Sequence, residues 1–235
     1  MPLSIQYTDL QAKRVIYCLI AVECGFAVTY VVIHILHPGL SWGPLRPLSD
    51  LDSEKSLSTW FSAIQLFAVG ALLLLAARNN RQKEYLSNFA LTVAGLIFIW
   101  LSADEDTQLH ENLTYMARHF GMSEISFVGE WGAWLIAYAA LGLLGMALGA
   151  KHLKALWRHF NSVAVVGLAG AATYIVGAAG LEVASFPLRN SEATATLHLI
   201  TVVFEEFFEM VGVSIILYAT LMLANRVSTP REPQL

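Results

Sequence analysis

The chain has 235 residues, a formal net charge of −4 and a pI near 6.0. Hydrophobic residues make up 56% of it and charged residues only 14%, against about 45–50% and about 25% in soluble globular domains. With a mean hydropathy of +0.57, this apolar surplus cannot be hidden inside a soluble core of this size, so lipid must solvate part of the surface. The acidic balance excludes a nucleic-acid-binding protein, which needs a concentrated basic surface.

Apolar stretches long enough to cross a membrane, which takes about 20 residues, follow one another along the chain. We expect each stretch to form a helix, because lipid offers backbone groups no hydrogen-bond partners. Six windows qualify: Val15–Leu36, Thr59–Ala76, Tyr85–Ser102, Trp131–Ala150, Val163–Leu181 and Phe207–Ala224. The third helix is expected to continue through Asp104–Phe120 and the sixth to include Ser191–Glu206, so that both extend past the outer membrane interface. The sequence therefore predicts an all-α fold, a single six-helix transmembrane domain over residues 1–235.

Glycines are frequent in the fourth and fifth spans. They occur at Gly142, Gly145 and Gly149, and at Gly167, Gly170, Gly177 and Gly180. Small residues let helix backbones approach closely inside a membrane, so we expect tight helix contacts along both spans.

Lys and Arg are unevenly distributed between the two sides of this bundle. Of the 14 such residues, four fall in the first, third and fifth loops, and the rest fall at the termini and in the other loops. The four are Arg46, Lys55, Arg118 and Arg189. Because cytoplasmic loops carry the excess of positive charge, this distribution predicts that the N- and C-termini are both cytoplasmic.

Carboxylates gather at one depth of the predicted bundle. Counting 1.5 Å per residue from the cytoplasmic ends of the helices, Glu105, Glu182 and Glu205 reach the outer edge of the hydrocarbon. Ionised groups in or beside an apolar helix are costly unless they are paired or hydrated. Three helices therefore bring acids to one plane, and we predict that these side chains converge in a shared polar pocket.

The sixth helix sharpens this prediction. Glu205 and Glu209 lie one turn apart on one face, with His198 on the same line, and like charges at this spacing destabilise a helix unless something compensates. Carboxylates combined with imidazole suit Zn²⁺, Mn²⁺ or Fe²⁺, so we predict a divalent metal site at the outer interface. The expected ligands are Glu105, His110, Glu111, Glu182, Glu205, Glu206 and Glu209. Asp104, Gln108 and His198 are expected to orient these ligands by hydrogen bonds without binding the metal themselves. The alternatives are a solvated acidic cap on the third helix and simple structural hydrogen bonds for the other acids.

Glu23 is a separate case, because it lies in the middle of the first span, nine residues beyond Arg14. An ionised carboxylate at this depth is expensive. We expect Glu23 to be protonated or hydrogen-bonded to a neighbour such as Gln65, and a role in a proton relay is the alternative.

The acidic segments resemble those of a group of uncharacterised bacterial multi-pass membrane proteins. The shared patterns are Asp-Glu…His-Glu, Gly-x-Glu and Glu-Glu-x-x-Glu-Met. Here they read Asp104-Glu105…His110-Glu111, Gly180-Leu181-Glu182 and Glu205-Glu206-Phe207-Phe208-Glu209-Met210. The likeness covers roughly residues 85–225 and implies no established activity. We expect a multi-pass protein of a bacterial inner (plasma) membrane.

Three functions fit these observations. The first is a metal-binding protein, which as an enzyme would act on a lipid or other amphipathic substrate with the metal as Lewis acid or water activator. The second is a proton- or cation-coupled transport protein, although only Glu23 and Gln65 continue the polar positions toward the cytoplasm. The third is a structural or accessory subunit of a homo-oligomer or membrane complex, whose acids contact a partner. The sequence does not decide whether the protein is an enzyme.

Overall fold

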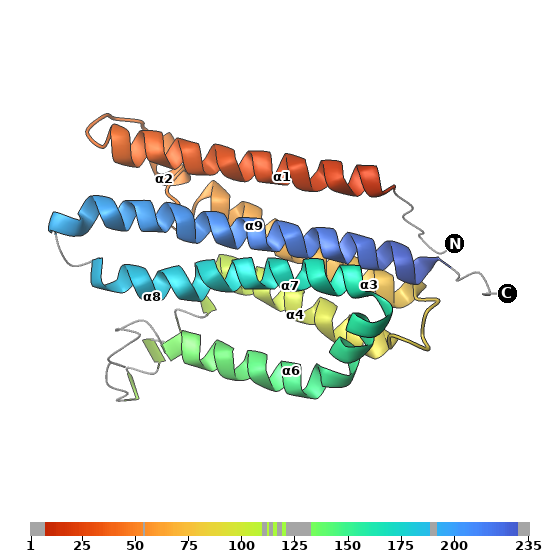
Figure 1. The fold of residues 1–235 in the computed structure, drawn as a ribbon. Coiled ribbons are helices and arrows are strands. Elements are labelled where there is room, and N and C mark those ends of the chain that lie inside the picture. Colours follow the sequence, from red (N-terminus) through yellow and green to blue (C-terminus); the bar gives the residue numbers. More distant parts are fainter. Residues whose placement is uncertain are drawn as a thin grey trace.

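The computed structural model describes residues 8–53, 55–109, 112, 115–116, 119–120, 133–188 and 192–229. Within these ranges every regular element is a helix, and six helices are long and apolar enough to cross a membrane. This confirms the all-α prediction and the expected number of apolar helices. The long helices run side by side, and the first residues of α1 and the last residues of α9 lie at the same end of the bundle (Figure 1). We call this the terminal end, and we call the opposite end, where α2 (Leu45–Leu48) lies, the loop end.

Two of the six apolar helices change their winding toward the loop end. The first apolar helix consists of α1 (Asp9–Tyr30) followed by the π-helical η1 (Val31–Leu36). The fifth consists of α7 (Asn161–Ile175), the π-helical η2 (Val176–Leu181) and α8 (Glu182–Ser185). The others are α3 (Leu57–Asn79), α4 (Asn88–Thr107), α6 (Ala133–His159) and α9 (Ala195–Ser228). Two short 3-10 turns, η3 (Phe186–Leu188) and η4 (Glu192–Thr194), lie between α8 and α9.

Serine side chains fix where two of these helices begin. The hydroxyls of Ser56 and Ser87 accept hydrogen bonds from backbone N–H groups in the first turns of α3 and α4, which satisfies donors that have no partner within the helix. Because Ser87 caps α4, that helix begins at Asn88 and not at Tyr85 as predicted.

The predicted continuation of the third helix through Phe120 is interrupted after Thr107, and beyond the interruption the described residues Leu109, Asn112, Tyr115, Met116 and His119 are again helical. α4 ends at Thr107, because Gln108 adopts the left-handed conformation with φ of 56° and its N–H donates to the carbonyl oxygen of Asp104 at 2.9 Å. A residue in this conformation commonly ends a helix. The sixth helix does extend beyond its apolar part, since α9 begins at Ala195.

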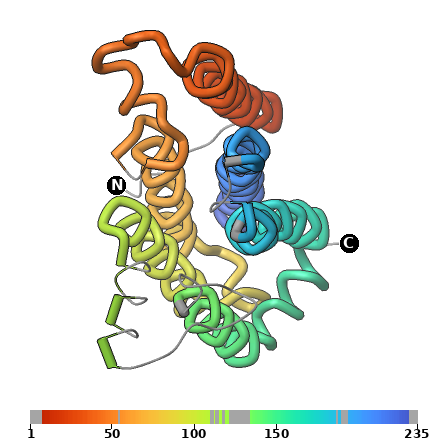
Figure 2. The backbone as a smooth tube through the Cα atoms, turned by 90° about the vertical axis from the view of Figure 1, so that its left-hand side faces the viewer, coloured from red at the N-terminus to blue at the C-terminus, as the bar shows by residue number. Residues whose placement is uncertain are grey.

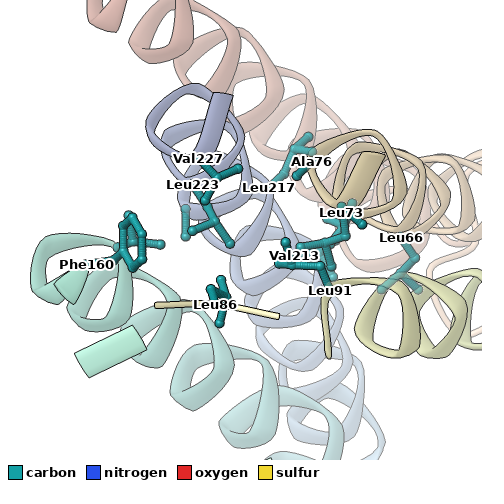
Figure 3. Close-up of a cluster of buried hydrophobic side chains, with 14 residues drawn as sticks. Leu66, Leu73, Ala76, Leu86, Leu91, Phe160, Val213, Leu217, Leu223 and Val227 are labelled. Carbon is teal, nitrogen blue, oxygen red and sulfur yellow. The ribbon is translucent and has the colours of Figure 1, made fainter. Parts of the chain in front are cut away.

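The main hydrophobic core fills the half of the bundle toward the terminal end. Leu73 and Leu91 from α3 and α4 meet Leu217 and Leu223 from α9, and Phe160 closes the cluster from the turn between α6 and α7 (Figure 3). A smaller cluster of Tyr30, Leu51 and Val202 lies toward the loop end. Buried apolar side chains thus dominate one half of the molecule.

Seen along the bundle, α9 lies between α1, α3 and α7, whereas α6 lies at the periphery and packs mainly on α7 (Figure 2). Glycines allow α7 and α9 to approach closely. A Cβ atom on Gly212 would lie 2.5 Å from the backbone N of Tyr174, and one on Gly170 would lie 2.8 Å from the backbone N of Ile216. Both distances are shorter than any normal contact, so only glycine fits at these two positions.

Candidate functional site

Four carboxylates act electrostatically on one hydroxyl group, that of Tyr174 near the end of α7. In order of decreasing effect they belong to Glu209, Glu105, Asp104 and Glu206. Two of them come from α4 and two from α9, so acids of both helices lie in the neighbourhood of this end of α7. We call Tyr174 and these four residues the Tyr174 cluster.

The π-helical η2 brings α9 against the fifth span at this cluster. A Cβ atom on Gly177, the second residue of η2, would lie 2.7 Å from the carbonyl oxygen of Glu205 and 2.8 Å from Cγ of Glu209. Only glycine therefore allows the Glu209 side chain to lie where it does. Short π-helical segments inside α-helices are rare and frequently occur at functional sites.

Asp104 connects the cluster to α6. Its side chain is buried, and the hydroxyl of Tyr138 donates a hydrogen bond to Oδ2 of Asp104 at 2.7 Å. The ring of Trp134 packs edge-on against the ring of Tyr138, with centroids 5.9 Å apart. Hydrogen bonds to ionised acceptors are shorter and stronger than neutral ones. Tyr138 therefore holds the Asp104 carboxylate in one orientation.

A second group of acids surrounds Tyr30 at the end of α1. The side chain is almost fully buried, and Asp50, Asp52 and Glu206 act electrostatically on its hydroxyl. The Tyr30 ring also stacks on the imidazole of His34 at a centroid distance of 4.5 Å. Glu206 acts on both tyrosines, so the polar region extends from α7 across α9 to α1.

The structure places only some of the predicted metal ligands in the Tyr174 cluster. Glu105, Glu206 and Glu209 belong to the Tyr174 cluster, and so does Asp104, which was expected to support the ligands. Glu205 is buried on α9 and Glu182 is half-buried at the start of α8.

The remaining predicted residues lie elsewhere or outside the described ranges. Gln108 ends α4, and His198 lies in the second turn of α9, where its Nδ1 is buried without a hydrogen-bond partner in the described structure. His110 and Glu111 lie outside the described residues. Among the residues that are described, no group of three or more His, Cys, Asp or Glu side chains is arranged to hold a metal ion.

Glu23 forms a separate polar network at mid-depth between α1, α3 and α9. Its side chain is 0% exposed, and its Oε1 accepts hydrogen bonds from Nε2 of Gln65 at 2.9 Å and from Oγ of Ser214 at 2.6 Å. Nε2 of Gln65 also donates to Oγ of Ser214 at 2.7 Å. The predicted contact with Gln65 is present, and Ser214 adds a third helix to it. We call these three residues the Glu23 network.

Sequence reasoning missed Tyr174, Tyr138 and Ser214. A usable signal existed for the two tyrosines, because each lies in an apolar span and a buried Tyr hydroxyl usually has a polar partner. Ser214 gave no such signal, since serine is common in membrane helices and hydrogen-bonds readily across them.

A family model described as a domain of unknown function, DUF8692, matches residues 19–224. The chain belongs to the DUF8692 family. The DUF8692 match includes the first span, so it covers the Glu23 network as well as the Tyr174 cluster and extends well beyond the predicted likeness over residues 85–225. No curated protein and no solved structure matches the chain.

Proposed function

We propose that this DUF8692 protein is an integral membrane protein that binds a divalent cation at its loop end. The observation that supports this proposal is the convergence of carboxylates from α4 and α9 on Tyr174 of α7. Like charges held close together in a buried site repel one another, and a cation or a proton removes the repulsion. A divalent ion would therefore stabilise an arrangement that is otherwise electrostatically unfavourable.

The proposed ligands begin with Glu105 and Glu209, whose carboxylates act most strongly on the Tyr174 hydroxyl. Because the described residues do not present three ligand groups ready to hold an ion, the glutamate side chains would turn toward the cation as it binds. Glu182, Glu205 and Glu206 at the same end of the bundle, together with His110 and Glu111, complete the proposed set. Carboxylates with one imidazole favour Zn²⁺, Mn²⁺ or Fe²⁺.

This site would suit chemistry on an amphipathic substrate. With both termini in the cytoplasm of a bacterial cell, the loop end would face the outer side of the inner membrane, beside the lipid head groups. There the metal would act as a Lewis acid or activate water, and a carboxylate that does not bind the metal would act as a base. The enzymatic part of the proposal rests on the cation site and falls with it.

The apolar core disfavours the alternative of a transport protein. A cation or proton path would have to continue from the Glu23 network to the terminal end. The described side chains that fill this half of the bundle include Val213, Leu217, Leu223 and Val227, all of which are apolar and buried. We therefore favour a site that binds its ligand from the loop end over a path through the molecule.

The proposal is tested by thermal unfolding of the purified protein in detergent after removal of metal. We expect Zn²⁺, Mn²⁺ or Fe²⁺ to raise the Tm of the wild type, because a ligand that binds only the folded state adds about 2.7 kcal/mol of stability at a concentration 100 times its Kd. Glu209→Gln and Glu182→Gln should largely abolish the rise. Glu84→Gln is the matched control, since Glu84 is exposed in the turn between α3 and α4.

The opposite result is equally informative. If no divalent ion shifts the Tm and the two Gln variants are themselves more stable than the wild type, the acids carry protons or have a purely structural role. The accessory-subunit hypothesis, in which the acidic end contacts a partner protein, would then replace the metal site.

A further inference from the structure

The Glu23 network has more hydrogen-bond acceptors than donors. Both hydrogens of the Gln65 amide and the hydrogen of the Ser214 hydroxyl are used within the network. Two acceptor oxygens, Oε2 of Glu23 and Oε1 of Gln65, are buried and have no hydrogen-bond partner in the part of the chain that the structure describes. Buried polar atoms without a partner are rare in folded proteins. The network therefore lacks one hydrogen.

Among the described residues, no charged side chain acts on the Glu23 carboxyl to hold it ionised. The groups that act on its carboxyl are the neutral side chains of Ser214 and Gln65. Along the packed helices, the titratable residues nearest to this network are Tyr17, Cys18, Cys24 and Tyr30 on α1, Glu209 and Tyr218 on α9, and Arg78 at the far end of α3. None of them is among the groups that act on the Glu23 carboxyl. An ionised carboxylate buried at mid-membrane without a charged partner is strongly unfavourable.

We propose that Glu23 is a proton-binding site that controls how firmly α1 docks on α3 and α9. One proton on Oε2 removes the charge, turns this oxygen from an acceptor into a donor and makes its O–H available to Oε1 of Gln65. The proton is the ligand, and it enters and leaves as H⁺ exchanged with water. This inference is independent of the cation site proposed above.

Docking depends on Glu23 because of its place on α1. Leu19, Glu23, Phe26 and Tyr30 follow one another at alternating spacings of four and three residues, so they form one stripe along the helix. Leu19 packs on the main core, and the Phe26 ring packs edge-on against Phe61 of α3 at 5.5 Å. Glu23 is at the centre of this stripe, so a charge there would separate the two apolar contacts on either side of it.

The first test is the pH dependence of thermal unfolding, measured in the presence of a chelator so that divalent ions play no part. The folded state would keep a proton that an unfolded chain releases above about pH 4.5. Rising pH therefore favours unfolding, and the unfolding equilibrium constant of the wild type relative to Glu23→Gln should increase tenfold per pH unit. Glu84→Gln, which removes an exposed carboxyl, should keep the wild-type dependence.

The second test observes the proton in the folded protein and does not depend on unfolding. The infrared spectrum of the wild type at pH 7 should contain the C=O band of a protonated carboxylic acid. Glu23→Gln should lose this band, and Ser214→Ala should shift it, because Ser214 donates to Oε1 of Glu23. Glu84→Gln should leave the band unchanged.

Two results would overturn the proposal. In the first, the carboxylic-acid C=O band is absent from the wild type or unchanged in Glu23→Gln, and the stability of the two proteins also varies with pH in the same way. The other is a Tm that rises with Na⁺ at constant pH in the wild type but not in Glu23→Gln, which would identify a sodium ion as the ligand.

Discussion

Tyr138 and Asp104 form a single hydrogen bond that joins α6 to α4 at the loop end. α6 otherwise packs mainly on α7, so this bond has a large share in fixing the helix that borders the Tyr174 cluster. The acceptor is buried, and a buried carboxylate that loses a hydroxyl donor is less well solvated.

Replacing Tyr138 by Phe should therefore lower the free energy of unfolding by about 1.5–3 kcal/mol, the usual range for a hydrogen bond to a charged group. Unfolding in detergent by heat or denaturant measures the loss. Tyr17→Phe is the control, because Tyr17 is exposed on α1 and should tolerate the change. Equal stabilities of the two variants would show that Asp104 does not depend on Tyr138.

At the scale of single residues, the sequence predicted charged groups better than neutral ones. Counting along the helices placed Glu105 at the outer edge of the hydrocarbon and Glu209 about one turn deeper, and both act on Tyr174 in the structure. Acids are rare in apolar spans, so each one is a signal in itself. Tyr174 and Ser214 could not be singled out, because a neutral polar residue shows its importance only when the rotation of its helix is known.

At the scale of helices, the glycine pattern was informative for one span and misleading for another. Gly170 and Gly177 of the fifth span lie against the α9 backbone, as expected from close packing. For Gly142, Gly145 and Gly149 of α6, no described residue lies within 4 Å of an added Cβ. Glycine permits a close contact but does not specify which partner, if any, makes it.

This contrast predicts opposite effects of the same substitution. Gly212→Ala should lower the free energy of unfolding by about 1–3 kcal/mol, the usual effect of overpacking, because its Cβ would lie 2.5 Å from the backbone of Tyr174. Gly145→Ala should be neutral or stabilising by up to about 1 kcal/mol, since alanine favours a helix. The same unfolding assay compares them, and a destabilised Gly145→Ala would reveal a partner on that face of α6.

The end of α4 shows a second limit at this scale. The chain carries neither glycine nor proline at the point where the helix stops, and the polar residues that follow Ser102 are compatible with a longer helix. The stop depends on Gln108, a residue type that seldom adopts a positive φ. The residue types of this segment therefore do not mark where the helix ends.

For the whole molecule, the apolar runs predicted how many helices could cross a membrane but not how they are arranged. All six are strongly apolar, so composition does not indicate that α9 lies between α1, α3 and α7. Besides its buried Val and Leu side chains, α9 makes close contacts there through Gly212 and Ser214. These depend on which face of each neighbouring helix is turned inward.

The orientation of the whole bundle is predicted from its Lys and Arg distribution. A reporter enzyme that works only in the cytoplasm should be active when fused after Arg226, and one that works only outside should be active when inserted near Arg46. Activity of the external reporter after Arg226 would reverse the orientation. The acidic loop end would then face the cytoplasm.

The uneven distribution of buried apolar side chains has an electrical consequence. In an energised membrane, most of the voltage would fall across the tightly packed low-dielectric half, where a full crossing is worth about 2.3 kcal/mol per unit charge per 100 mV. A cation reaching the Tyr174 cluster from the loop end would cross little of this field. Glu23 lies between the main core and the smaller cluster, because Leu19 packs on the former and Phe26 on the latter. A proton moving to Glu23 from the loop end would travel further into the field, so its occupancy would respond to membrane voltage as well as to pH.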